Sequence, residues 1–269
     1  MPNTLSSFQH KILTYYSEKG RDLPWRKTTD PYSIWISEVM LQQTQVDRVI
    51  DYFKRWLAKW PTVHDLAKAD RADVLTMWMG LGYNNRAVKL HEAAKTISTA
   101  FKGDVIAAMM SDTKIPGIGP YTKSAVRIFA ANHDVVTVDT NIRRILIHEF
   151  ALDEKMSDKD LWVIAQNCLP LAKSRDWHNA LMDYGATLLT ARKTGIKPKT
   201  RQSKFEGSDR QIRAKMLRHL LAIPTGASFD ELLDVGNNKN EAERVKKILE
   251  KMAGEGLVVA DGSTWVLKK

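Results

Sequence analysis

Residues 112–145 constrain the fold of this chain more than any other stretch of its sequence. They have the pattern of a helix, a tight turn with the sequence IPGIGP, a second helix and a short apolar run that ends in a single acid. Gly117 and Gly119 allow backbone angles that a Cβ atom forbids, and Pro120 suits the first turn of a helix. We therefore predict a helix–hairpin–helix whose second helix begins with outward-pointing N–H groups, a geometry that binds phosphate.

The acid that ends this stretch is Asp139, which follows the apolar run Val135–Val138. A carboxylate placed directly after buried residues has its ionisation controlled by its surroundings. Taken alone, the turn favours an ordinary helix–turn–helix corner with a surface aspartate. The pairing of IPGIGPYT with VDTNIRR about twenty residues later favours a functional element instead.

Composition limits the class of protein. The chain has 269 residues, enough for one large or two moderate domains, and a formal net charge of +10. A basic excess favours a polyanionic partner, either nucleic acid or an acidic membrane surface, although many basic proteins have neither. The single cysteine, Cys168, excludes a disulfide framework and any four-cysteine metal or iron–sulfur site. We find no signal peptide and no membrane-length apolar run, and expect an intracellular protein of the cytoplasm, nucleoid or nucleus.

The periodicity of apolar residues predicts a mainly α-helical chain. We expect an all-α domain over residues 1–190, with no strand before residue 250, and a basic linker over 191–208. The linker is interpreted equally well as a solvated segment or as an arm that follows a DNA backbone. Residues 209–269 predict a small winged-helix-like domain with Ser228 as a helix cap and a terminal hairpin that turns at Asp261-Gly262.

A candidate acid lies in the predicted helix 31–46, where Glu38 is surrounded by apolar and amide side chains. Gln42 and Gln43 would continue its polar face without charge, so that this face can approach stacked bases. A carboxyl group with few compensating charges has a raised pKa, as a general acid requires. The alternative is a surface glutamate, the usual environment of this residue type.

Five motifs, in chain order, carry a family resemblance: LPWRKTTDPYSIWISEVMLQQTQV, GLGYNNRA, IPGIGPYT, VDTNIRR and LMDYGA. Together they span residues 23 to about 193 and resemble the MutY-type adenine DNA glycosylases of the helix–hairpin–helix, endonuclease III superfamily. The resemblance implies a two-lobed all-α glycosylase fold. It also implies a monomeric enzyme that hydrolyses the N-glycosidic bond of adenine mispaired with 8-oxoguanine or guanine in double-stranded DNA.

The resemblance assigns roles to four residues of the reaction. Glu38 is the acid that protonates adenine N7 and that also positions or activates water, while Asp139 stabilises the cation on the sugar, directly or through a covalent intermediate. Asn141 holds the phosphate or the environment of the aspartate, and Tyr121 packs against both carboxylates. Lyases of the superfamily have a Schiff-base lysine where this chain has Tyr121, and Lys123 lies about 200° around the helix, so we expect a monofunctional glycosylase.

Weaker assignments concern DNA and base recognition. Gln43 resembles the wedge that fills the vacated stack, and Tyr83 the aromatic residue inserted beside the opposing oxidised guanine. The hairpin residues expected at DNA are Pro116, Gly117, Ile118 and Gly119. The positions that line the adenine pocket are Trp25, Arg26 and Asp183. Core or surface packing is the alternative for Trp25 and Tyr83.

The sequence departs from this family in two places. Residues 186–195 lack the cysteines that usually hold a 4Fe–4S cluster there, so we predict that no cluster is bound and that Leu188 and Leu189 fill its space. Residues 209–269 are too short and too helical for the usual Nudix-like domain, which leaves open the preference for 8-oxoguanine. A mismatch thymine or uracil glycosylase and a non-catalytic DNA-binding protein are the rival interpretations.

Overall fold

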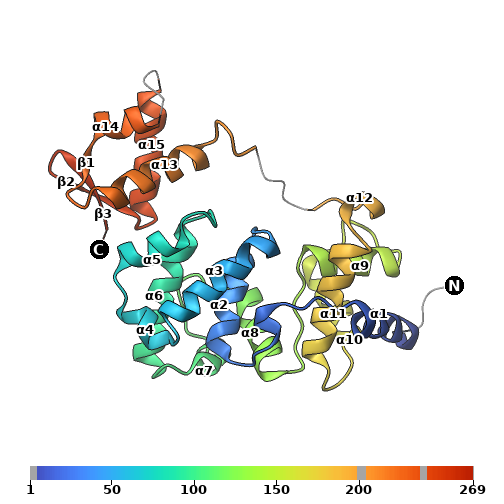
Figure 1. The fold of residues 1–269 in the computed structure, drawn as a ribbon. Coiled ribbons are helices and arrows are strands. Elements are labelled where there is room, and N and C mark those ends of the chain that lie inside the picture. Colours follow the sequence, from blue (N-terminus) through green and yellow to red (C-terminus); the bar gives the residue numbers. More distant parts are fainter. Residues whose placement is uncertain (1–4, 199–203, 237–240, 269) are drawn as a thin grey trace. The chain divides into compact units, whose positions relative to one another are not determined.

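We describe a computed structural model of the chain at residues 5–198, 204–236 and 241–268 (Figure 1). The chain forms two compact units. The first comprises Met1–Val39, Asp104–Lys114 and Ile118–Arg201, and the second comprises Met40–Gly103, Ile115–Gly117 and Gln202–Lys269. In the described part of the chain, no helix is long and apolar enough to cross a membrane.

The first unit is helical. Its elements are α1 (Leu5–Lys19), the short 3-10 helix η1 (Pro24–Arg26), most of α2 (Pro31–Leu41), α7 (Val105–Met110), α8 (Pro120–Ala131), α9 (Thr140–Glu149), α10 (Asp158–Cys168), α11 (Ser174–Thr187) and α12 (Ala191–Thr194). Helix α11 packs against α1, α8 and α9. In its core, the rings of Phe8 and Trp177 meet edge to face with centroids 5.5 Å apart.

Cap residues explain where several helices of this unit begin. Asp139 caps α9 by accepting a hydrogen bond from Ile142 N–H, and Ser157 caps α10 in the same way from Asp160 N–H. Pro120 occupies the first turn of α8, as the sequence predicts, and the helix is capped at its C-terminal end by Asn132, which has a left-handed φ of 53°.

The second unit begins with α3 (Val46–Lys59), α4 (Val63–Lys68), α5 (Arg71–Trp78) and α6 (Asn85–Ala100). Thr62 and Asp65 form a reciprocal capping box at the start of α4. Trp56 lies edge to face against both Trp60 and Trp78, so that aromatic packing joins α3 to α5.

The same unit contains the C-terminal elements α13 (Asp209–Ala222), β1 (Ala227–Ser228), α14 (Phe229–Val235), α15 (Ala242–Gly254), β2 (Val258–Asp261) and β3 (Thr264–Leu267). The three strands form an antiparallel sheet in the order β1-β3-β2. This is the element order of a winged helix, and each of its helices contributes a buried apolar residue, Met216, Leu232 and Leu249. Ser228 caps α14 through a capping box with Glu231, as the sequence predicts.

Three local expectations are wrong. A strand does precede residue 250, because Ala227 and Ser228 pair with β3. The hairpin turns at Gly262-Ser263, because Gly262 takes the positive φ of 60° and Asp261 still pairs with Thr264. Helix α2 ends at Leu41, so Gln42 and Gln43 lie in a turn and do not extend the helix face of Glu38.

The predicted linker is partly helical, since Ala191–Thr194 forms the turn α12 with a Thr190 cap. Residues 199–203 of that linker lie outside the described residues, so the predicted DNA-tracking arm remains a prediction there. The proposed domain boundaries at 190 and 208 also remain predictions.

Candidate active site

Glu38 lies in an apolar part of α2. Asp30 begins the helix by accepting hydrogen bonds from the N–H and hydroxyl of Ser33. The following residues, Ile34, Trp35, Ile36 and Met40, are almost completely inaccessible to solvent. As a result only 8% of Glu38 is exposed, although it carries a carboxyl group.

The ionisation of Glu38 is set by this burial and by three neighbours. Burial raises the pKa of Glu38 to about 7, and the nearby charge of Asp139 adds to the rise. The hydroxyl of Tyr121, which donates to Glu38 Oε2 over 3.2 Å, and the charge of Arg26 both oppose the rise in pKa. A carboxyl group with a pKa near neutrality can carry a proton to a substrate and accept it back.

Asp139 has a different environment because it caps a helix. Its Oδ1 accepts from Ile142 N–H over 2.7 Å, and its Oδ2 accepts from the Asn141 side-chain amide over 3.2 Å. Burial raises the pKa of Asp139, while the N–H groups of Ile142 and Asn141 and the charge of Arg144 act to lower it. These donors and the positive end of α9 favour the ionised form of the carboxyl group.

Arg144 extends this arrangement and was not predicted from the sequence as a site residue. Its guanidinium donates to Asn141 Oδ1 over 2.6 Å and to the Gly185 carbonyl over 2.9 Å. A Cβ atom at Gly185 would lie 2.9 Å from Asn141 Cβ, so only glycine allows α11 to approach α9 here. Arg144 belongs to the motif VDTNIRR and Gly185 to the motif LMDYGA, so the two motifs are the sequence signal that could have identified these residues.

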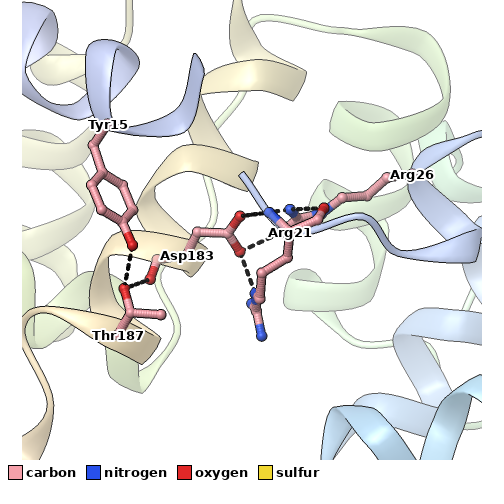
Figure 2. Close-up of polar contacts among 5 residues, drawn as sticks. All are labelled: Tyr15, Arg21, Arg26, Asp183 and Thr187. Carbon is pink, nitrogen blue, oxygen red and sulfur yellow. Dashed lines mark hydrogen bonds and ion pairs between the residues drawn. The ribbon is translucent and has the colours of Figure 1, made fainter. Parts of the chain in front are cut away.

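Asp183 is the centre of a buried ion network (Figure 2). Its carboxylate accepts from Arg21 N–H and Nε and from both terminal nitrogens of Arg26, over 2.6 to 2.8 Å. Burial alone would raise the pKa of Asp183, but the hydrogen bonds and charges of Arg26 and Arg21 hold it below its ordinary value. Arg21, which the sequence analysis does not predict as a site residue, therefore binds the same Asp183 carboxylate as Arg26 does.

Trp25, Arg26 and Asp183, the predicted residues of the base pocket, all lie in the first unit, and the ion network links Arg26 to Asp183. Asp183 is fully inaccessible, so its direct effect is on Arg26. The pKa of Glu38 in turn responds to the charge of Arg26, while Trp25 is buried within η1. Asp183 thus orients a cation that acts on the candidate acid. Contact of these residues with a base remains a prediction.

The hairpin turn requires one of its two glycines. Gly117 has a φ of 71°, and a Cβ atom there would lie 2.8 Å from Lys89 Cβ. Gly119 has a φ of −101° and open space around its Cβ direction, so it caps α8 without needing to be glycine. Pro116 and Ile118 complete the turn. The expectation that both glycines adopt angles forbidden to other residues is thus wrong for Gly119.

Gln43 and Tyr83 share an unusual backbone conformation. Gln43 has a φ of 56° and Tyr83 a φ of 50°, values that residues with a Cβ rarely adopt. Arg86 holds both turns: it donates to the Gln42 carbonyl over 2.7 Å and to the Gly82 carbonyl over 2.9 Å. Burial lowers the pKa of Arg86 to about 10. The sequence analysis does not predict Arg86 as a site residue.

Lys123 points away from the candidate acids, as its position on the helix predicts. Its Nζ donates to the carbonyl of Ser111. Tyr121, two residues earlier, contacts Glu38. Burial and the two neighbouring carboxylates raise the pKa of Tyr121 well above its ordinary value, so it stays a neutral hydrogen-bond donor.

The residues that follow α11 do not fit a 4Fe–4S cluster. Such a cluster needs four thiolates, and the chain has only Cys168, which is buried in α10. Burial raises the pKa of Cys168 to about 11, so it is a neutral thiol. Leu189 packs partly buried against the core, while Leu188 is 40% exposed. Leu189, but not Leu188, is therefore placed to fill space there.

The chain has a helix–hairpin–helix, then Asp139 as a helix cap, and the buried Glu38 lies in the same unit as Asp139. These features place it in the class of helix–hairpin–helix proteins that carry a site with two carboxyl groups. Residues 36–167 match the family model described as HhH-GPD superfamily base excision DNA repair protein. The chain is 36% identical over 275 residues to the adenine DNA glycosylase of Mycolicibacterium smegmatis, a match that covers 94% of this chain and 93% of that protein. The chain therefore belongs to the HhH-GPD superfamily of base excision DNA repair proteins.

Other relatives match a part of their own length or the fold alone. The adenine DNA glycosylase of Rattus norvegicus is 37% identical over 199 residues, which cover 69% of this chain but only 39% of that protein. Among solved structures, a thermostable thymine-DNA glycosylase is 30% identical with a TM-score of 0.65, covering 71% of this chain and 89% of its own. A trapped endonuclease III–DNA covalent intermediate has a TM-score of 0.61 at 18% identity, covering 73% of this chain and 91% of its own, and shares the fold.

Proposed function

We propose that this protein is a monofunctional DNA glycosylase that hydrolyses the N-glycosidic bond of adenine mispaired with 8-oxoguanine or guanine in double-stranded DNA. The observation that carries the proposal is the pair of carboxyl groups with different environments. Burial raises the pKa of Glu38 to about 7, while the burial that raises the pKa of Asp139 is opposed by the helix-terminal N–H groups of α9 and by the charge of Arg144. Two titratable groups tuned in different ways are the usual arrangement for acid and base roles. The adenine DNA glycosylases among the relatives support adenine as the base.

The proposed reaction begins with extrusion of the adenine, because its glycosidic bond cannot be reached within a stacked duplex. Protonated Glu38 gives its proton to adenine N7. The C1′–N9 bond then breaks, and its electron pair leaves with the base. The sugar becomes an oxocarbenium-like cation, which the Asp139 carboxylate stabilises electrostatically or through a transient bond. Water adds to C1′, and the Glu38 carboxylate takes the proton that water releases.

Tyr121 and Asn141 support the two acids in this scheme. Tyr121 donates a hydrogen bond to Glu38 and has no amine, so a Schiff base with the sugar cannot form at this position. Asn141 donates to Asp139 and is itself held by Arg144. We assign Gln43, Tyr83 and the hairpin residues 116–119 to DNA contacts, and no metal or iron–sulfur cluster takes part in the scheme.

Thymine release is the second candidate function, because the thermostable thymine-DNA glycosylase shares 30% identity and the fold. Four duplexes that differ only in the target pair, A·8-oxoguanine, A·G, T·G and U·G, separate the two under single-turnover conditions. We expect base release from the first two. Release confined to T·G or U·G would replace the adenine assignment, and release from none would favour a non-catalytic DNA-binding protein.

A further inference from the structure

A groove in the C-terminal part of the chain is lined mainly by cationic side chains. It has a volume of about 420 Å³ and lies between α13 and α15. Its lining residues are Asp209, Arg210, Arg213, Arg244, Lys247, Ile248 and Lys251. Five of these seven side chains carry a positive charge, and one carries a negative charge. The cations of α15 recur at a spacing of three to four residues, which places them on one helix face.

Acidic neighbours orient two of the arginines. Arg213 pairs with Glu255, and Arg244 pairs with Asp209 and Glu241 over 2.8 Å. Lys247 is 3.9 Å from Glu243, and both side chains are more than 70% exposed, so this pair is largely screened by water. The groove therefore combines guanidinium groups held in place with lysines that can pair with an incoming anion.

Arg210 connects this groove to the turn that carries Tyr83, within the same unit of the chain. Its Nη1 donates to the Tyr83 hydroxyl over 3.2 Å, and its guanidinium lies 5.7 Å from the centre of the Tyr83 ring. Arg71, in α5, donates to the carbonyl of Gly256, which lies in the turn between α15 and β2. The side chain of Arg210 therefore lines the cationic groove and also contacts the turn that the proposed function assigns to DNA.

We propose that the groove between α13 and α15 binds backbone phosphates of the same duplex that Tyr83 contacts. The inference rests on the proposed function in taking duplex DNA as the partner, but it does not depend on which base is released. Each phosphate neutralised by a protein cation releases condensed counterions, so the groove contributes to the salt dependence of DNA binding. The C-terminal part of the chain is on this basis a second backbone-binding element, in addition to the hairpin.

Paired charge-neutral variants test the proposal in the full-length chain. Lys247→Gln with Lys251→Gln removes two positive charges from the groove. Arg218→Gln with Lys246→Gln removes two exposed positive charges from the same two helices outside the groove lining. The measurement is the slope of log Kobs against log salt concentration for an undamaged duplex, with thermal melting as the folding check.

We expect the groove variant to reduce this slope by about 1 to 2, since each lost phosphate contact contributes about 0.9. The control pair should leave it close to that of the unaltered protein. Equal reductions in both variants, or none in either, would overturn the proposal. If the unaltered protein released no base, the four-duplex turnover experiment would show it, and the proposed function would fail. The slopes of log Kobs against log salt concentration would still test the groove, because they measure binding to an undamaged duplex.

Lysine acetylation by an N-hydroxysuccinimide ester gives a second measurement that needs no variant. Duplex DNA should protect Lys247 and Lys251 at least severalfold more than Lys246. Equal labelling of the three lysines with and without DNA would contradict the inference. So would equal protection by inorganic phosphate at the same total phosphate concentration, because the groove would then be a site for a free anion.

Discussion

The hydroxyl of Tyr121 donates a hydrogen bond to Oε2 of Glu38, over 3.2 Å, across 83 residues of sequence. This bond stabilises the ionised form of Glu38 and so lowers its pKa, against a larger effect of burial that raises it. Tyr121 therefore limits how far the pKa of the candidate acid can rise. The relationship leads to a prediction about pH dependence, and the surrounding contacts lead to four more.

Tyr121→Phe should shift the alkaline limb of the single-turnover pH profile to higher pH. Removal of the hydrogen bond leaves only the charge of Arg26 to oppose the effects of burial and Asp139, so the pKa of Glu38 rises above about 7 and its protonated form persists to higher pH. The measurement is adenine release against pH. Tyr15→Phe is the matched control, because it removes a hydroxyl that bonds to Thr187. A limb that moves to lower pH would contradict this role of Tyr121.

Glu38→Gln should reduce base release by about 10²- to 10⁴-fold, the usual contribution of a general acid. It should also stabilise the folded protein at alkaline pH. The folded pKa of Glu38, about 7, exceeds its ordinary value of 4.5, so the folded chain binds the extra proton and loses stability as pH rises between these values. The full difference is on the order of 3 kcal/mol above pH 7.

Thermal melts of Glu38→Gln and the unaltered chain at pH 5 and pH 8 measure this effect. We expect the variant to gain more in melting temperature at pH 8 than at pH 5. An equal shift at both values would mean that Glu38 titrates normally in the folded state.

Asp139→Asn should abolish most base release while leaving the fold intact. Asparagine remains a good helix cap, so α9 keeps its first-turn hydrogen bond, but the carboxylate charge that stabilises the sugar cation is lost. Asp139→Ala removes both features and should also cost about 1 kcal/mol of unfolding free energy. Single-turnover kinetics with urea unfolding separate the two effects. Unchanged turnover in Asp139→Asn would remove the proposed mechanism.

Asp183→Asn should destabilise the chain by about 3 to 5 kcal/mol, because it leaves two guanidinium groups without their buried counter-charge. Asp22→Asn is the control, since Asp22 makes an exposed pair with Lys27. The folded pKa of Asp183 is lowered, so its stabilising effect is present above its ordinary pKa and is lost as pH falls toward the folded value. Equal melting temperatures for the two variants would contradict the ion network.

Gly185→Ala should impair base release through Asn141. The added Cβ atom would lie 2.9 Å from Asn141 Cβ and 3.1 Å from Ile145 Cδ1, so α11 and α9 must separate or Asn141 must shift. Gly254→Ala is the matched control in a helix, because open space surrounds that position. We expect slower turnover and a loss of about 1 to 3 kcal/mol for Gly185→Ala only. Equal behaviour of both variants would mean that the contact between α9 and α11 is loose.

The sequence was sufficient to predict the helical fold and the hairpin because local signals agree with the tertiary structure. The Pro120 start of α8 and the Ser228 cap of α14 each depend on residues within a few positions. The motifs predict Glu38 and Tyr121 as site residues, and the structure brings the two side chains into contact, while their catalytic roles stay predictions.

What was missed depends on contacts between distant segments. The roles of Arg21 and Arg86 are defined by carboxylate or carbonyl partners on other segments, and arginine in a helix or loop gives no local sign of such partners. The end of α2 at Leu41 was missed for a related reason. The sequence from 42 to 45 has no proline or glycine, and the turn is stabilised by Arg86 from another helix.

Arg86 has a further consequence for how this chain can vary. Its guanidinium bonds to carbonyls at Met40 and Gln42 and to carbonyls at Leu81 and Gly82, so one side chain fixes two turns. A residue inserted into either turn would move half of these acceptors away and leave buried N–H groups without partners. Both turns are therefore expected to resist changes of length, because an insertion in either one would cost Arg86 part of its hydrogen bonds.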